Sequence, residues 1–201
     1  MGRLATAFVT ILVFIVVVCA VAVVMAMTGM VPIAAGKHHI APIEWFLETA
    51  ADEAVDRGGE GVHPPPGVDS PEMLRMGIQH YQEMCVLCHG APGLEPSELA
   101  KGLYPHPPLL ERKKHLQVGA VYWIVKNGVR DTGMPAFGPT HDEQELWAIA
   151  AFTAKMPHLT PAQYLEQARA AGVEKPGGAE MDEPMQGQSG PPAAAPPHGP
   201  G

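Results

Sequence analysis

The longest apolar stretch of the chain lies near its amino end, where Leu4 to Met27 is interrupted only by Thr6 and Thr10. As a helix, this run would span roughly 36 Å at 1.5 Å per residue, which is enough for a hydrocarbon core of ~30 Å. A cleaved signal peptide is the alternative, but its apolar region is usually only about 7 to 15 residues long. The pattern therefore predicts an uncleaved transmembrane anchor over residues 1–30.

The charges on the two sides of this run indicate its orientation. Arg3 and the α-amino group precede the run, whereas Lys37 and then an acidic stretch follow it. Positively charged residues tend to stay on the cytoplasmic side of a membrane. We therefore expect a single-pass protein of the bacterial inner membrane with its soluble part in the periplasm.

Beyond the anchor, the pattern changes to amphipathic helices separated by glycine and proline. Residues 42–55 begin at a proline and repeat apolar side chains at helical spacing. A linker is predicted to start at Gly58 and Gly59, so that residues 31–69 hold a juxtamembrane helix and a Pro/Gly-rich linker. The helix would serve either as a spacer or as a docking element for the membrane or a partner subunit.

Residues 70–157 are predicted to form a helical domain. Ser70 is an N-cap candidate that is followed by a proline in the first turn, and the helix that it starts should run to about Cys85. A second helix is expected over residues 118–127, with Gly128 as its C-terminal cap. The domain should therefore contain α-helices and no sheet.

The carboxyl-terminal third continues this pattern and then loses it. A capping box of Thr140 and Glu143 is predicted to start a helix that runs to residue 156. One more helix is expected within residues 158–174, beginning at a capping box of Thr160 and Gln163. From residue 175 onward Pro, Gly, Gln and Ala dominate and large apolar side chains are few. Residues 175–201 are therefore predicted to be a disordered tail.

Two of these helices are predicted to cross closely. Gly77 and Tyr81 are four residues apart and so share one helix face. Because glycine lowers helix stability, its place there is best explained by another helix that passes close by. Ile149 and Phe152 on the last helix of the domain offer the matching apolar surface.

The formal net charge of −8 lies mostly outside this domain. Residues 38–61 carry six acidic side chains and one arginine, and three more acids follow residue 175. A surface of this sign argues against nucleic acid as a partner, but it does not select another one.

The chemistry of the chain is concentrated at Cys85-Val86-Leu87-Cys88-His89, a Cys-x-x-Cys-His motif. This spacing lets both sulfurs reach the two vinyl groups on one edge of a haem as thioethers, while the following histidine reaches the iron. The sequence therefore predicts one covalently bound haem c, attached through Cys85 and Cys88, with His89 as the proximal ligand. A zinc site or a redox dithiol is the alternative, but the only other cysteine, Cys19, lies in the apolar run.

A methionine is the candidate for the sixth iron ligand. Met134 stands between a glycine and a proline in an irregular segment between two helices, where its thioether could be presented across the haem face. His106, His115 or an open position are the alternatives. We therefore expect the metal ligands to be His89 and Met134.

Taken together, residues 70–157 resemble the haem domain of class I c-type cytochromes. The attachment motif, the Gly77 and Tyr81 pair, Met134 with its following proline, and the last helix with Phe152 carry the resemblance. The resemblance implies an all-α domain around one haem. It also implies that a proline carbonyl accepts the second N–H of the proximal histidine and that a leucine two residues later packs on the ring.

Pro108 and Leu110 fit these last two roles, with Pro107 as the alternative to Pro108. The resemblance further implies an electron carrier, not an enzyme, which would serve a respiratory complex, an oxidase or a periplasmic dehydrogenase. A haem enzyme or gas sensor with an open distal site is the other hypothesis. The haem domain could also be a fixed part of a larger complex.

Overall fold

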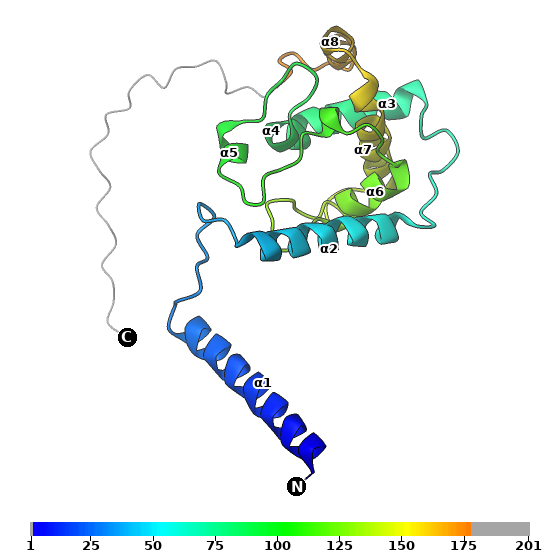
Figure 1. Ribbon diagram of the computed structural model, residues 1–201. Helices are drawn as coiled ribbons and strands as arrows, with labels where there is room; N and C mark the ends of the chain where they lie inside the picture. The colour runs from blue at the N-terminus through cyan, green and yellow to red at the C-terminus, as the bar shows by residue number, and fades with distance from the viewer. Residues whose placement is uncertain (1, 178–201) are drawn as a thin grey trace, which may run out of the picture. The chain divides into compact units, whose positions relative to one another are not determined.

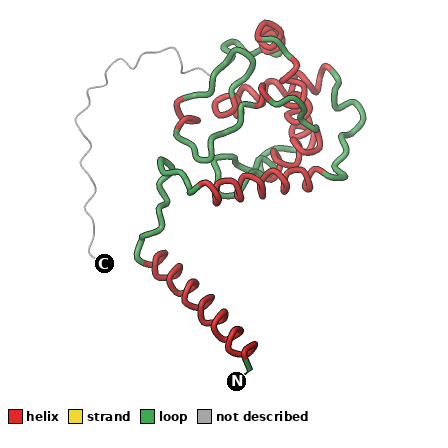
Figure 2. The backbone as a smooth tube through the Cα atoms, in the orientation of Figure 1, coloured by secondary structure: helices red, strands yellow, loops and turns green. Residues whose placement is uncertain are grey.

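The computed structural model describes residues 2–177 and contains helices and no β-strand within that range (Figure 2). The all-α fold predicted from the sequence is confirmed. The α-helices are α1 (Arg3–Met27), α2 (Ala41–Gly59), α3 (Pro71–His80), α4 (Val86–His89), α5 (Glu98–Lys101), α6 (Val118–Asn127), α7 (Glu143–Lys155) and α8 (Pro161–Ala170) (Figure 1). A π-helical turn at Tyr81–Cys85 and 3-10 turns at Leu110–Arg112 and Met156–His158 complete the set in these residues.

The chain divides into two compact units, with the boundary between Thr49 and Ala50. In the first unit, α1 is 25 residues long and none of its residues is buried against protein. Its length and its mean hydropathy of 3.3 suit a membrane span. The apolar run near the amino end therefore forms one continuous helix that is long enough to cross a membrane.

In the second unit, α3 and α7 cross at Gly77. A Cβ atom at residue 77 would overlap the carbonyl group of Ala148 and lie 2.7 Å from the Cβ of Phe152. The rings of Tyr81 and Phe152 meet edge to face, with their centroids 5.6 Å apart. The predicted crossing is confirmed, and glycine is needed because the α7 backbone occupies the space of a side chain.

The start of α7 differs from the sequence prediction. The N-cap is Asp142, whose side chain accepts from the N–H of Glu145, while the Glu145 carboxylate accepts from the N–H of Asp142. The predicted pair of Thr140 and Glu143 is therefore wrong by two residues. A capping box needs only the correct residue types three apart, and two overlapping candidates occur here.

The end of α2 also differs. Gly58 and Gly59 were predicted to begin a linker, but they are the last two residues of the helix and pack against α6. A Cβ atom on Gly58 would overlap the ring of Trp123, and one on Gly59 would lie 2.7 Å from the Cα of Ala120. The second half of α2 is thus part of the same compact unit as the helical domain.

On the other side of the unit, α8 covers α3. Thr160 and Gln163 form the predicted capping box of α8, and Tyr164 is 0% exposed. The side chain of Gln82 donates to the Tyr164 hydroxyl and accepts from the N–H of Gly177 at 2.9 Å. Most of the predicted disordered tail, residues 178–201, lies outside the described residues.

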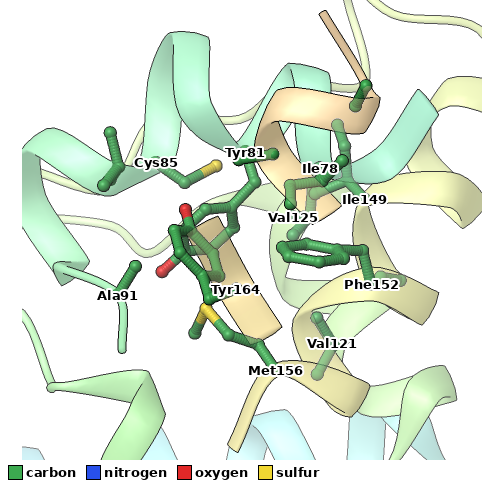
Figure 3. Packing of buried hydrophobic residues seen from close by; sticks show 14 of the residues in the cluster. Ile78, Tyr81, Cys85, Ala91, Val121, Val125, Ile149, Phe152, Met156 and Tyr164 are labelled. Atoms are coloured by element: carbon green, nitrogen blue, oxygen red, sulfur yellow. The ribbon is translucent and has the colours of Figure 1, made fainter. Parts of the chain in front are cut away.

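The core of the unit lies between α3, α6, α7 and α8. Figure 3 shows the ring of Phe152 near those of Tyr81 and Tyr164, with Met156 below them. Cys85 enters this core from the end of the π-helical turn. The apolar core and the Cys-x-x-Cys-His motif therefore meet at Cys85.

Candidate haem-attachment site

One continuous helical path carries the motif. It runs from α3 through the π-helical turn Tyr81–Cys85 into α4, which ends at His89. Gly90 follows with φ +64°, and its carbonyl oxygen accepts a hydrogen bond of 2.7 Å from the buried Tyr81 hydroxyl. This bond fixes the backbone directly after His89.

The two cysteines of the motif lie in different surroundings. Cys85 is 8% exposed, whereas Cys88 is half-buried. Burial, together with the neighbouring Cys88, raises the pKa of the Cys85 thiol to about 12. A thiol with this pKa stays protonated at neutral pH and is a poor ligand for a hydrated metal ion.

The imidazole of His89 is held by the main chain of a distant segment. Its Nδ1 atom lies 2.9 Å from the carbonyl oxygen of Pro108. Because a carbonyl only accepts, Nδ1 must carry the proton, and Nε2 then keeps its lone pair. Burial lowers the pKa of His89, against the opposing effect of the Pro108 hydrogen bond, so the neutral imidazole is favoured.

Two further residues lie close to this arrangement. Leu110 begins the 3-10 turn after Pro108 and packs against the core. The N–H of Ser97 donates to the carbonyl oxygen of Leu87 inside the motif, at 2.8 Å. Among the described residues, the Ser97 hydroxyl is the one buried side-chain N or O atom without a hydrogen-bond partner. An unsatisfied hydroxyl beside the motif suggests that the polar environment there is completed by a bound group.

Met134 lies in the loop after α6 and packs, half-buried, against the core. Its neighbour Gly133 lies against Leu103, since a Cβ atom there would come within 2.9 Å of the leucine side chain. The Met134 loop therefore meets the segment that runs from the motif to Pro108. Met156, in contrast, is 0% exposed in the middle of the core.

Two residues of the site escaped the sequence reasoning. The sequence predicts Tyr81 only as a packing residue, and it predicts no role for Thr132, whose hydroxyl accepts from the N–H of Met134. The signal for Thr132 is its place two residues before Met134, because threonine often binds nearby main-chain groups. The hydrogen bond from the Tyr81 hydroxyl to Gly90 has no such signal, because the two residues are nine positions apart in the sequence.

The residues present fit a covalent haem better than a metal ion held by protein alone. No group of three or more His, Cys, Asp or Glu side chains that could hold a metal ion occurs within residues 2–177. The zinc alternative therefore lacks its ligands in this range. A neutral histidine whose Nε2 is free and whose Nδ1 is bound to a carbonyl is instead the form of the side chain that binds iron.

Comparison with known proteins agrees with this geometry. Residues 72–152 match the protein family described as cytochrome C oxidase, cbb3-type, subunit III. A search of curated proteins gives no match, and a search of solved structures gives none. The matched stretch begins at the start of α3, contains the motif, and ends on α7 at Phe152. Residues 72–152 therefore form a class I c-type cytochrome domain, a haem-based electron-transfer module that binds haem c covalently.

Proposed function

We propose that this protein is a membrane-anchored monohaem cytochrome c that carries single electrons within a respiratory chain. The observation that carries the proposal is the hydrogen bond between Nδ1 of His89 and the carbonyl of Pro108, directly after the two cysteines. When bound, haem c supplies a one-electron Fe(II)/Fe(III) couple. In this proposal Cys85 and Cys88 form the thioethers, and His89 is the proximal ligand.

The role of the other residues follows from what an electron carrier needs. Met134 would fill the sixth position, and soft sulfur there favours the ferrous state and raises the potential. Leu110 would pack against the ring, and Pro108 would keep the His89 imidazole oriented through the change of charge. With both axial positions filled, electrons can move with little rearrangement, so we propose a carrier and not an enzyme.

The single Cys-x-x-Cys-His motif of the chain supports one haem, because only three cysteines are present. The apolar helix α1 supports attachment to a membrane as a single-pass protein. We propose that the cytochrome domain faces the periplasm, on the side opposite Arg3. The matched family is described as an oxidase subunit, which supports a respiratory complex as the redox partner.

Substitution of Met134 tests the assignment as a carrier. The oxidised wild-type protein is expected to show the weak near-infrared band of sulfur-to-iron charge transfer, and its reduced form should bind carbon monoxide poorly. Met134→Ala should abolish the band, lower the midpoint potential and open the iron to carbon monoxide. Met156→Leu is the control, and the band should survive in it.

Two results would contradict the assignment. A wild-type protein that is high-spin and binds carbon monoxide readily would favour a haem enzyme or gas sensor with an open distal site. A band that survives in Met134→Ala but is lost in Met156→Leu would move the sixth ligand to Met156.

Intact-mass measurement of the protein purified in detergent tests the anchor and the haem number. The expected mass is that of a chain that starts at Met1 or Gly2 and carries one haem. A mature start between Ala22 and Ala35 would contradict the anchor, and a chain without covalent haem would contradict the attachment site.

A further inference from the structure

The loop that carries Met134 is closed on itself by main-chain hydrogen bonding. The N–H of Val129 donates to the carbonyl oxygen of Met134 at 3.1 Å. Between these residues the chain turns back through Asp131, which has φ +59°. The backbone carbonyl of Met134 is thus fixed to the first residue of its own loop.

The hydroxyl of Thr132 fixes the other main-chain group of Met134. It accepts from the N–H of Met134 at 3.1 Å and donates to the carbonyl oxygen of Val129 at 2.8 Å. One side chain therefore joins both ends of the loop. Thr132 is half-buried, so water competes with these bonds less than it would on an open surface.

The closed loop is attached to a rigid helix. The N–H groups of Phe137 and Gly138 donate to the carbonyl oxygens of Val125 and Lys126 near the end of α6, at 3.0 Å each. At Gly128, with φ +66°, a Cβ atom would lie 2.9 Å from the carbonyl oxygen of Met134. The backbone of Met134 is therefore held from both sides against the end of α6.

A methionine side chain has three rotatable bonds and adapts easily, so its own rotamers do little to fix the sulfur. The position of the sulfur then depends on how firmly the backbone of the residue is held. In the Met134 loop, Thr132 is the side chain that holds this backbone directly, through both of its hydrogen bonds.

We propose that Thr132 is a positioning residue for the sixth iron ligand, and that its hydroxyl lowers the rate at which the Met134 sulfur dissociates from the iron. This inference rests on the proposed function, in which Met134 is that ligand. Loss of the hydroxyl leaves the N–H of Met134 and the carbonyl of Val129 unpaired. The loop then opens more often, and an external ligand gains access to the iron.

The test uses the full-length, haem-loaded protein and compares Thr132→Val with Thr132→Ser. Valine keeps the shape of threonine without its hydroxyl, whereas serine keeps the hydroxyl. Cyanide is added to the oxidised protein, and the rate of its binding is followed with the near-infrared band. Thr132→Val should bind cyanide about tenfold faster or more, because two hydrogen bonds are lost, and Thr132→Ser should stay near the wild type.

Two further variants separate the hydroxyl from local packing. Thr140→Val makes the same change at an exposed threonine whose hydroxyl donates to Phe137 at 3.2 Å, and its cyanide rate should be that of the wild type. Thr132→Ala also removes the hydroxyl, and its side chain is smaller than that of valine. Its cyanide-binding rate should therefore match that of Thr132→Val, and it replaces the valine variant if that protein does not accumulate.

The outcomes distinguish this inference from the proposed function. If the wild type lacks the near-infrared band, the assignment of Met134 as ligand fails, and the inference fails with it. If the wild type has the band and Thr132→Val and Thr132→Ala bind cyanide at the wild-type rate, the inference alone is overturned. Equal acceleration in Thr132→Ser and Thr132→Val would also overturn it, since side-chain shape would then be responsible.

Discussion

Gly77 of α3 and Phe152 of α7 are so close that a Cβ atom on residue 77 would lie 2.7 Å from the Cβ of Phe152. The same Cβ would overlap the carbonyl of Ala148. Neither neighbour is the end of a flexible side chain, so a substitution must push the two helices apart. Ile78 of α3 and Ile149 and Phe152 of α7 are buried core residues on these two helices.

Gly77→Ala should therefore lower the free energy of unfolding, although alanine is the better helix former. Overpacking typically costs about 1–3 kcal/mol, whereas alanine in place of glycine in a helix gains only about 0.5–1 kcal/mol. Urea unfolding of the haem-loaded protein measures the difference. Gly102→Ala is the control, because the nearest atom to its Cβ would be 3.5 Å away. Equal stability of Gly77→Ala and wild type would show that the crossing is looser than described.

Tyr81→Phe removes the hydroxyl that donates to the carbonyl of Gly90. At neutral pH this variant should lose about 1–3 kcal/mol of unfolding free energy, because a buried carbonyl is left without its donor. Tyr104→Phe makes the same change at a half-buried tyrosine that is not part of the core cluster, and it should have a smaller effect. A neutral result for Tyr81→Phe would mean that the bond does not stabilise the turn after His89.

Alkaline pH should weaken the wild-type fold through the same tyrosine. Burial raises the pKa of Tyr81 well above its ordinary value of 10.0. Above pH 10 the unfolded chain releases this proton while the folded state keeps it, so stability falls as pH rises. Urea midpoints measured between about pH 8 and 11 should drop more steeply for wild type than for Tyr81→Phe. Parallel curves would contradict the burial of an unionised Tyr81.

Gln82→Leu tests whether the segment after α7 is integral to the domain. Gln82 is 6% exposed and binds both Tyr164 and the N–H of Gly177. Its loss should destabilise the fold by about 1–3 kcal/mol and speed amide hydrogen exchange in residues 161–177. Gln144→Leu is the matched control at an exposed position. Unchanged exchange in α8 would show that the helix is held by other contacts.

Gly59→Ala tests the packing of α2 on α6. Its Cβ would lie 2.7 Å from the Cα of Ala120, so the helices should separate and expose the chain around Arg57. Trypsin is expected to cut the variant after Arg57 several-fold faster than wild type, because cleavage follows local opening. The control is Gly36→Ala, because a Cβ atom at Gly36 would have no atom within 4 Å. This variant should be cut after Arg57 at the wild-type rate.

The sequence by itself determined the features that depend on a few neighbouring residues. The apolar run of α1, the N-cap at Ser70, the capping box at Thr160 and the cap at Gly128 all appear where the sequence places them. The Cys-x-x-Cys-His motif belongs to this group, because haem attachment depends on spacing within five residues. Local geometry fixes these features whatever the rest of the chain does.

Tertiary structure decided the features that join distant segments. Pro108, and not Pro107, accepts the hydrogen bond from His89, which depends on the path of the chain over the nineteen positions that separate these two residues. Likewise, Gly58 and Gly59 belong to a helix and not to a linker because Trp123 and Ala120 pack against them. The sequence offers two overlapping capping boxes for α7, one at Thr140 and one at Asp142, and the fold decides that Asp142 is the N-cap.

The hydroxyl of Thr132 shows the same division within one loop. Its place two residues before Met134 could be read from the sequence, but its bond to Val129 required the loop to close. Closure depends in turn on the bonds from Phe137 and Gly138 to α6. These last two bonds join residues twelve positions apart, 137 to 125 and 138 to 126, so they form only after the rest of the fold has offset the entropy of bringing the segments together.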